Sequence, residues 1–140
     1  MPDVHELVDP VTGTIFARNF YSPEFAGKIA FADCSESSRT LTGDRTEFLG
    51  RNGSASNPAA MRRVRLSNRT GAGMDPCAAI QAQVSLEDGH ERIIVFTLGA
   101  AASETDVRQL VQRFRGEGNA QAALEGVWHY WSQTLGAVHV

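Results

Sequence analysis

The sequence lacks a long hydrophobic run. Its densest apolar stretch, residues 93–102, is far shorter than the roughly 20 residues that a membrane-spanning helix needs. The first residues also lack the basic region and the apolar segment of a signal peptide. We therefore expect neither a secretion signal nor a membrane span, and we expect a cytoplasmic location.

Cysteine and lysine are scarce. Cys34 and Cys77 are the only cysteines and form no CxxC pair, so we expect two reduced, buried thiols and no disulfide framework. Lys28 is the only lysine, and the net charge is -3. Because nucleic-acid binders usually carry a clear basic excess, this balance argues against a nucleic-acid partner. The one basic stretch, residues 62–65, alternates arginine with apolar side chains as a solvated strand face would.

The chain has 140 residues, of which 42% are hydrophobic and 21% charged, which is typical of a globular protein with a real core. Residues 1–102 contain short β-prone runs separated by turn signals. We predict strands at 14–21, 28–32, 38–42 and 61–66, and a hairpin over 79–98, where apolar and polar residues alternate. A long polar loop is predicted at 50–58.

Residues 103–140 have helical periodicity. Ser103 is a predicted N-cap, and the apolar residues from Val107 to Phe114 follow the i, i+3, i+4, i+7 rule. We predict a second helix that is capped by Asn119 and ends at Gly136, with a short strand or linker after it. Its aromatic residues, Trp128, Tyr130 and Trp131, fit either a helix packed on a sheet or a sugar-stacking platform, and the packed interpretation is favoured.

Few patterns in the sequence point to catalysis. The four histidines are scattered without the spacing of metal ligands, and no GxSxG nucleophile motif is present. The densest polar constellation lies in residues 43–53. It contains the candidate site residues Asp44, Arg45, Glu47, Arg51 and Asn52. Such a cluster forms either a turn held by ion pairs, which composition alone favours, or a loop that binds a sugar or an anion.

Three stretches carry a family resemblance. Residues 16–25 (FARNFYSPEF), 42–53 (TGDRTEFLGRNG) and 71–79 (GAGMDPCAA) resemble the cyclic β-1,2-glucan synthetases. That family has a region of the glycoside hydrolase family 94 type, shared with cellobiose and chitobiose phosphorylases. The resemblance implies an antiparallel β-sandwich, part of a supersandwich, followed by two α-helices. It assigns residues 1–102 to the sandwich portion and 103–140 to a pair of linker helices.

The resemblance also implies a function. A catalytic (α/α)₆ barrel follows the linker helices in that family, so we expect no catalytic residue in this chain and a supporting role beside the barrel. The parent would act on β-glucosidic links by phosphorolysis or glucosyl transfer, with inorganic phosphate as a co-substrate and no cofactor or metal. The expected location of this chain is the cytoplasm, or the cytoplasmic side of the inner membrane as part of a larger membrane protein. Expected partners are the barrel, β-glucan and further copies of the chain. The alternative is a stand-alone glucan-binding module.

Overall fold

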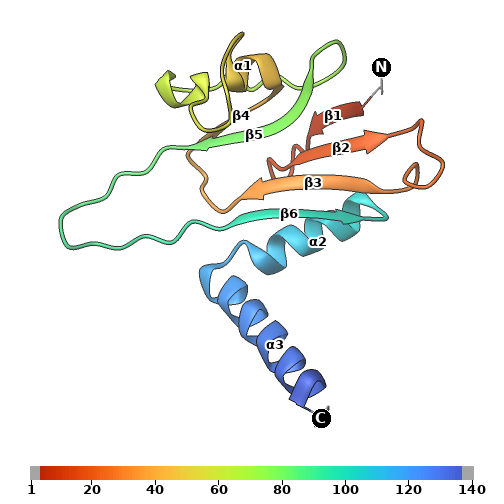
Figure 1. Cartoon of the computed structure of the whole chain (residues 1–140), viewed down its shortest axis with the longest axis vertical. Helices are drawn as coiled ribbons and strands as arrows, with labels where there is room; N and C mark the ends of the chain where they lie inside the picture. The colour runs from red at the N-terminus through yellow and green to blue at the C-terminus, as the bar shows by residue number, and fades with distance from the viewer. Residues whose placement is uncertain (1–3, 137–140) are drawn as a thin grey trace.

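The computed structural model describes residues 4–136, which form two antiparallel sheets followed by two longer helices (Figure 1). The predicted class, mainly antiparallel β with C-terminal helices, is confirmed. The strands are β1 (Val4–Val8), β2 (Ile15–Asn19), β3 (Ile29–Cys34), β4 (Arg39–Asp44), β5 (Pro76–Ala82) and β6 (Phe96–Ala101). The helices are α1 (Arg45–Leu49), the 3₁₀ helix η1 (Ala59–Arg62), α2 (Glu104–Phe114) and α3 (Glu117–Gly136).

The larger sheet has the strand order β1-β2-β3-β6, and α2 covers one of its faces (Figure 1). Phe16 and Phe31 from the sheet pack with Val107 and Val111 from the helix, and all four are buried. Gly99 on β6 lies opposite Phe31, and a Cβ there would stand 2.7 Å from the Phe31 ring. A glycine is therefore required where the ring crosses the neighbouring strand.

Helix α2 begins where the sequence predicts. Ser103 accepts a hydrogen bond from the backbone N–H of Asp106 at 3.1 Å, which satisfies one of the free amides of the first turn. The Asp106 carboxylate in turn accepts from the Ser103 hydroxyl at 2.7 Å. The predicted apolar stripe of this helix is the face that meets the sheet.

The second sheet pairs β4 with β5 and has its own small core. Ala60, Leu66 and Ala79 are buried there, with Phe48 of α1 packed against them. The segment 61–66 was predicted as a strand, and that prediction is wrong. It begins in η1 and continues as an irregular chain, in which Leu66 is buried while Val64 is 91% exposed. Alternation indicated a buried face, but no strand within residues 4–136 pairs with this segment.

The predicted hairpin over 79–98 is also wrong. Strands form at both ends of it, but β5 pairs with β4 and β6 pairs with β3, so the two belong to different sheets. The connecting segment 83–95 extends away from both sheets (Figure 1). Its two ends are fixed by backbone bonds from Gln83 to Ser38 and from Ser35 to Val95. Alternation predicts a strand but does not specify its partner.

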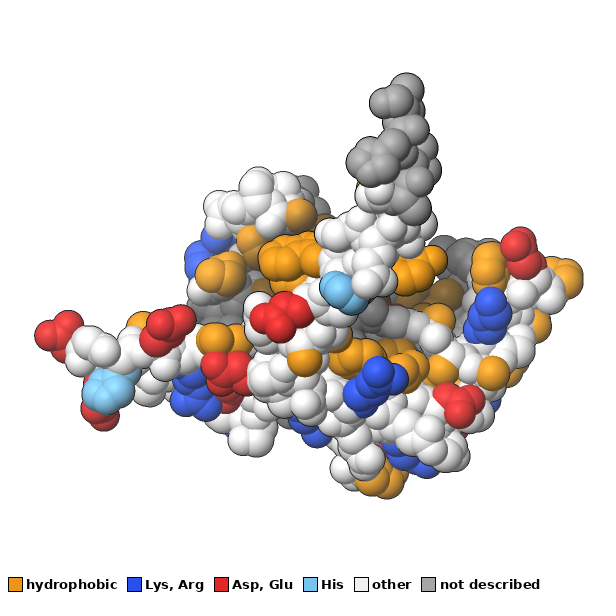
Figure 2. Space-filling model, turned by 90° about the horizontal axis from the view of Figure 1, so that it is seen from below, with side chains coloured by type: hydrophobic (Ala, Val, Ile, Leu, Met, Phe, Trp, Pro, Cys, Tyr) orange, Lys and Arg blue, Asp and Glu red, His pale blue; other side chains and the backbone are white. Residues whose placement is uncertain are grey.

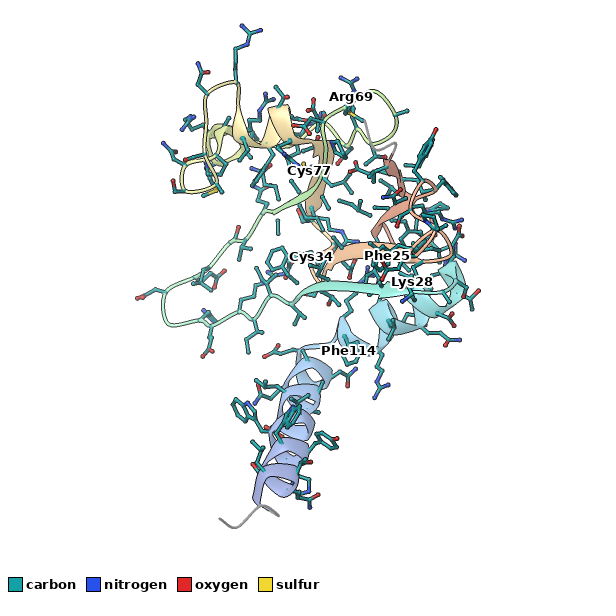
Figure 3. All side chains as sticks on the ribbon, turned by 45° about the vertical axis from the view of Figure 1, so that its right-hand side comes forward. Phe25, Lys28, Cys34, Arg69, Cys77 and Phe114 are labelled. Carbon is teal, nitrogen blue, oxygen red and sulfur yellow. The ribbon has the colours of Figure 1, made fainter. Side chains whose placement is uncertain are left out.

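Helix α3 starts at Glu117, two residues before the predicted cap, and reaches Gly136 as predicted. None of its residues is buried, and its side chains project with no other element beside most of the helix (Figure 3). The prediction that its aromatic residues pack on a sheet is therefore wrong. Trp128, Tyr130 and Trp131 are 61%, 60% and 52% exposed. The predicted strand or linker after Gly136 lies outside the described residues.

Both cysteines are free thiols, as predicted. Cys34 of β3 is buried, whereas Cys77 of β5 is only partly so, and Figure 3 shows them on separate strands. Burial of the Cys77 thiol and the neighbouring Glu6 raise its pKa to about 11. A thiol held in its protonated form is a weak nucleophile, so this cysteine is suited to packing and not to catalysis.

Candidate functional site

The predicted polar constellation is built around the short helix α1. Asp44 is its N-cap, and its carboxylate accepts from the backbone N–H of Thr46 at 2.9 Å. Arg45 reaches back to the loop before β5, with Nε 3.7 Å from the Asp75 carboxylate and Nη2 donating to the Pro76 carbonyl at 3.3 Å. Both side chains therefore hold the corner between β4 and β5.

Glu47 is an anchor for the irregular chain that follows η1. Its carboxylate accepts from the Thr42 hydroxyl at 2.7 Å and from the Ser67 backbone N–H and hydroxyl at 3.0 and 2.6 Å. Arg63 lies 3.7 Å away. Burial alone would raise the pKa of Glu47, but the hydrogen bonds from Ser67 and Thr42 outweigh it and hold the pKa below its ordinary value. This carboxylate is ionised and fully used by the fold.

Arg51 and Asn52 differ from the other three candidates. They are exposed and line a shallow hollow of about 340 Å³ beside the 50–58 loop, with Arg62 on its edge. Arg62 donates to the Asn57 side chain at 3.0 Å. The predicted site is thus divided: Asp44, Arg45 and Glu47 have structural bonds, while Arg51 and Asn52 face solvent.

A second polar centre was missed by the sequence reasoning. Asp33 of β3 is buried, and its carboxylate accepts from Arg39 at 2.9 Å, from Thr14 at 3.0 Å and from two nitrogens of Arg115 at 2.7 and 3.0 Å. Burial would raise its pKa, but Arg115 and Arg39 reverse the effect, and the pKa lies below its ordinary value. The sequence did contain one signal for this centre, because Asp33 is the only charged residue in the otherwise apolar strand β3.

Asp9 forms a parallel connection from the β1–β2 turn to α2. Its buried carboxylate accepts from Arg108 at 2.7 Å, and Arg108 also bonds Glu104 at 3.1 Å. Glu104 in turn pairs with Arg18 of β2 at 2.7 Å. The hydrogen bonds from Arg108, with smaller help from Thr12, lower the pKa of Asp9 to about 2 despite its burial. Two buried carboxylates therefore fasten α2 to the sheet.

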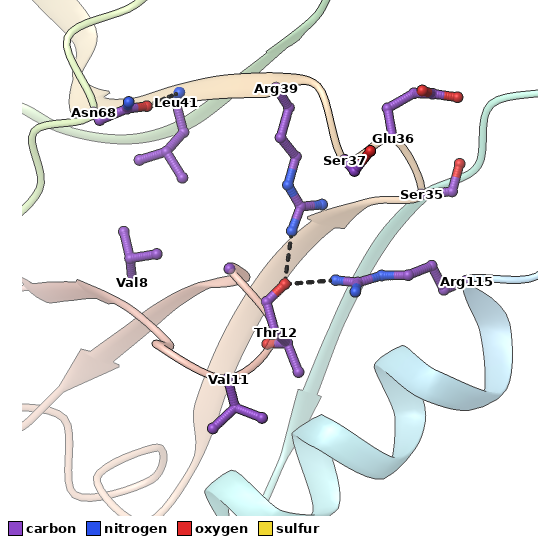
Figure 4. A pocket seen from close by; sticks show the side chains of 11 residues that line it. Val8, Val11, Thr12, Ser35, Glu36, Ser37, Arg39, Leu41, Asn68 and Arg115 are labelled. Atoms are coloured by element: carbon purple, nitrogen blue, oxygen red, sulfur yellow. Dashed lines mark hydrogen bonds between the residues drawn. The ribbon is translucent and has the colours of Figure 1, made fainter.

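A cavity of about 540 Å³ lies where the two sheets and the end of α2 meet (Figure 4). The Thr12 carbonyl at its wall accepts from both Arg39 and Arg115, each at 2.8 Å. Further polar lining comes from Ser35, Glu36, Ser37 and Asn68, and apolar surface from Val8, Val11 and Leu41. No residue of this cavity was among the predicted site residues.

Glu6 of β1 is a buried carboxylate with a shortage of partners. One of its oxygens, Oε2, has no hydrogen-bond partner among residues 4–136, and a Cβ on Gly43 would stand 2.0 Å from it. Burial raises the pKa of Glu6 to about 7, with partial opposition from the Cys77 backbone. Gly43 is thus the residue that leaves space for this carboxylate against β4.

Residues 4–136 contain no group of three or more histidine, cysteine, aspartate or glutamate side chains placed to hold a metal ion. No helix in that part of the chain is both long and apolar enough to cross a bilayer. The structure does bring polar groups together in three places. These are the two aspartate networks, the lining of the cavity, and the α1 corner, by which we mean Asp44, Arg45 and Glu47.

Comparison with known proteins agrees with the motifs and the fold. Residues 4–117 match the family described as glycosyl hydrolase 94, supersandwich domain, a match that ends at the first residue of α3. The chain is also 33% identical over 133 residues to a protein named cyclic beta-(1,2)-glucan synthase NdvB from Rhizobium meliloti (strain 1021). That alignment covers 94% of this chain but 5% of the relative. Because the family match spans most of the chain, the chain belongs to the glycosyl hydrolase 94 supersandwich family.

Proposed function

We propose that the chain is a non-catalytic sandwich and linker portion of a larger carbohydrate-active enzyme. The parent would act on β-glucosidic links by phosphorolysis or glucosyl transfer, with inorganic phosphate as its co-substrate. The role of this portion is to hold a following catalytic (α/α)₆ barrel, and to contribute to contacts between copies. The relative that supports this is a glucan synthase by name, and the chain spans about a twentieth of it.

The observation that carries the proposal is the exposed apolar face of α3. Leu124, Val127, Trp128, Trp131 and Leu135 recur at helical spacing, and 44–65% of each is exposed. We call these five residues the α3 stripe. Apolar residues at i, i+3, i+4, i+7 and i+11 lie on one side of a helix, which is the pattern of a helix that is packed against a partner. Figure 2, which views the molecule from below, shows hydrophobic side chains gathered on that face.

The polar residues around α1 also favour a non-catalytic role. Both carboxylate oxygens of Glu47 accept hydrogen bonds from its own domain, and one oxygen of Asp44 caps α1. A general acid or base needs a free face toward a substrate. Arg51 and Asn52 keep such a face, and we propose them as contacts at a domain interface or substrate rim.

The exposed aromatic residues favour one alternative, a stand-alone glucan-binding module. Trp128 and Trp131 lie on the same side of α3, where they could stack on sugar rings. Tyr130 does not extend such a surface, because its ring stands at 78° to that of Trp131. The docking role therefore accounts better for the stripe.

One pair of variants separates the two functions. In the first, Trp128→Ser and Trp131→Ser disrupt the α3 stripe, and in the matched control His129→Ser and Gln133→Ser alter the opposite, exposed side of the same helix. We expect the wild-type chain to self-associate in sedimentation velocity, the stripe variant to be monomeric and the control to behave as wild type. Calorimetry with β-1,2-glucan should give no saturable heat.

Two results would contradict the docking role. A wild-type chain that stays monomeric at high concentration shows that the stripe has no affinity for another apolar surface. Saturable glucan binding that disappears in the stripe variant would establish the binding module instead. In the longer protein, the stripe variant should lose turnover and thermal stability, while the His129→Ser and Gln133→Ser control should keep both.

We also propose a cytoplasmic place for this domain, within a parent attached to the inner membrane. Its two free thiols are compatible with a reducing compartment. A membrane-impermeant thiol reagent tests this, with lysed and mildly denatured cells as the reference in which Cys77 is accessible. We expect labelling of Cys77 in that reference and none in intact cells, and labelling of intact cells to the reference level would contradict the proposal.

A further inference from the structure

We propose that the cavity between β4 and the end of α2 binds a small oxyanion, a carboxylate or a tetrahedral group, through the guanidinium groups of Arg39 and Arg115. The proposal depends on charge, on burial and on the shape of the cavity. It is independent of what α3 packs against.

The wall of this cavity carries one more positive charge than its protein partners neutralise. Arg39 and Arg115 share a single carboxylate, that of Asp33, and their other acceptors are the neutral carbonyls of Thr12 and Cys34. Glu36 also lines the cavity, but both of its oxygens accept from Arg92, at 3.0 and 2.6 Å. Three arginines thus face two carboxylates, and guanidinium groups stay charged at any physiological pH.

The surplus charge is poorly placed for hydration by bulk water. The Arg39 side chain is only 10% exposed and that of Arg115 is 32% exposed. A cation with so little contact with water gains more from an anion than an exposed one does. Arginine is also the side chain whose fixed N–H groups match the oxygens of a carboxylate or a phosphate-like group.

Both guanidinium groups are fixed in advance. Each donates to the Thr12 carbonyl (Figure 4) and to the Asp33 carboxylate, so binding would cost little side-chain entropy. Among residues 4–136, Arg39 Nε and Arg115 Nη1 make no hydrogen bond, which leaves one nitrogen on each side chain free to donate to a ligand. Asn68 and Ser37 offer further polar groups at the mouth of the cavity. A volume of about 540 Å³ accepts a small group of this kind.

The test uses a matched pair of Asn→Asp variants. Asn68 lines the cavity and its Oδ1 accepts from the Leu41 backbone N–H at 2.9 Å, a bond that an aspartate keeps. Asn19 accepts in the same way from the Tyr21 N–H at 3.0 Å, but it lies outside the cavity lining. Asn68→Asp adds a negative charge inside the cavity, and Asn19→Asp adds the same charge elsewhere.

Thermal unfolding is measured as chloride is replaced by sulfate, or by acetate, at constant ionic strength. We expect sulfate to raise the Tm of the wild type and of Asn19→Asp in a saturable way. Its affinity for Asn68→Asp should be at least about tenfold lower than for the wild type, because the added carboxylate repels the anion. Amide chemical shifts of Ser37 and Asn68 should move with the same midpoint in the wild type. A matching response to acetate would extend the ligand class to carboxylates.

Two outcomes would overturn the proposal. Equal, non-saturating rises in Tm for all three proteins would mean that sulfate acts only by exclusion from the protein surface. No rise in the wild type would mean that the surplus charge recruits no anion. If Asn68→Asp fails to fold, Ser37→Asp on the opposite side of the cavity mouth gives the same comparison, since Ser37 is exposed.

Discussion

Replacement of Glu6 by glutamine should stabilise the domain above neutral pH and remove a pH dependence that the wild type shows. Glu6 is 7% exposed, and burial raises its pKa from 4.5 to about 7 in the folded state. Between these two values, the unfolded chain has lost a proton that the folded chain keeps. The free energy of unfolding therefore falls as the pH rises from about 4.5 to 7, and the loss is complete above the folded-state pKa.

The size of the effect follows from the shift. Each pKa unit corresponds to 1.36 kcal/mol, so a shift of about 2.5 units makes the ionised carboxylate about 3 kcal/mol less favourable in the folded state. Glu6→Gln has nearly the same shape and carries no charge. It should therefore raise the free energy of unfolding by up to about 3 kcal/mol at pH 8 and change it little at pH 4.

Urea unfolding at a series of pH values checks this, with Glu24→Gln as the matched control because Glu24 is an exposed turn residue. The control should follow the wild-type curve throughout. If Glu6→Gln also follows it, or is destabilised equally at pH 4 and pH 8, then the buried carboxylate carries no ionisation penalty and the reasoning is refuted.

Three further predictions test other parts of the structure. Asp33→Asn leaves Arg39 and Arg115 without their carboxylate and should cost about 3–5 kcal/mol in urea unfolding, and a cost below ~1 kcal/mol would contradict the buried network. Gly99→Ala places a Cβ 2.7 Å from the Phe31 ring and should cost about 1–3 kcal/mol, whereas Gly118→Ala, where nothing lies nearby, should not destabilise. Glu47→Ala removes three hydrogen bonds to the carboxylate and should lower the free energy of unfolding by about 1–3 kcal/mol. Arg51→Ala should change it by no more than about 0.5 kcal/mol. If thermal unfolding shows Arg51→Ala to be the less stable variant, the α1 corner is misassigned.

Local patterns in the sequence were sufficient to predict elements whose position depends on a few nearby residues. Ser103 predicted the start of α2, and its periodic valines predicted the face that meets the sheet. The strands β2, β3 and β4 were predicted at nearly the right places. Strand β1 was missed because its inward position is occupied by Glu6, a residue that normally marks the solvent side of a strand.

Pairing between distant segments was not predictable in the same way. The alternation in 79–98 is real, but which strand lies beside β5 or β6 depends on the whole sheet and not on the run itself. The same limit applies to the candidate site. The candidate site was predicted from residues 44–52 because they are close together in the sequence. In contrast, Asp33, Arg39 and Arg115 are brought together only by the fold.

The aspartate networks also set an order of events during synthesis. Asp9 and Asp33 leave the ribosome well before Arg108 and Arg115, which are separated from them by 99 and 82 positions. Until α2 has emerged, the strands of the larger sheet cannot close without enclosing two carboxylates that lack their main partners. The nascent chain should therefore stay open and protease-sensitive until the end of α2 is available, and any truncation upstream of Arg115 should leave it in that state.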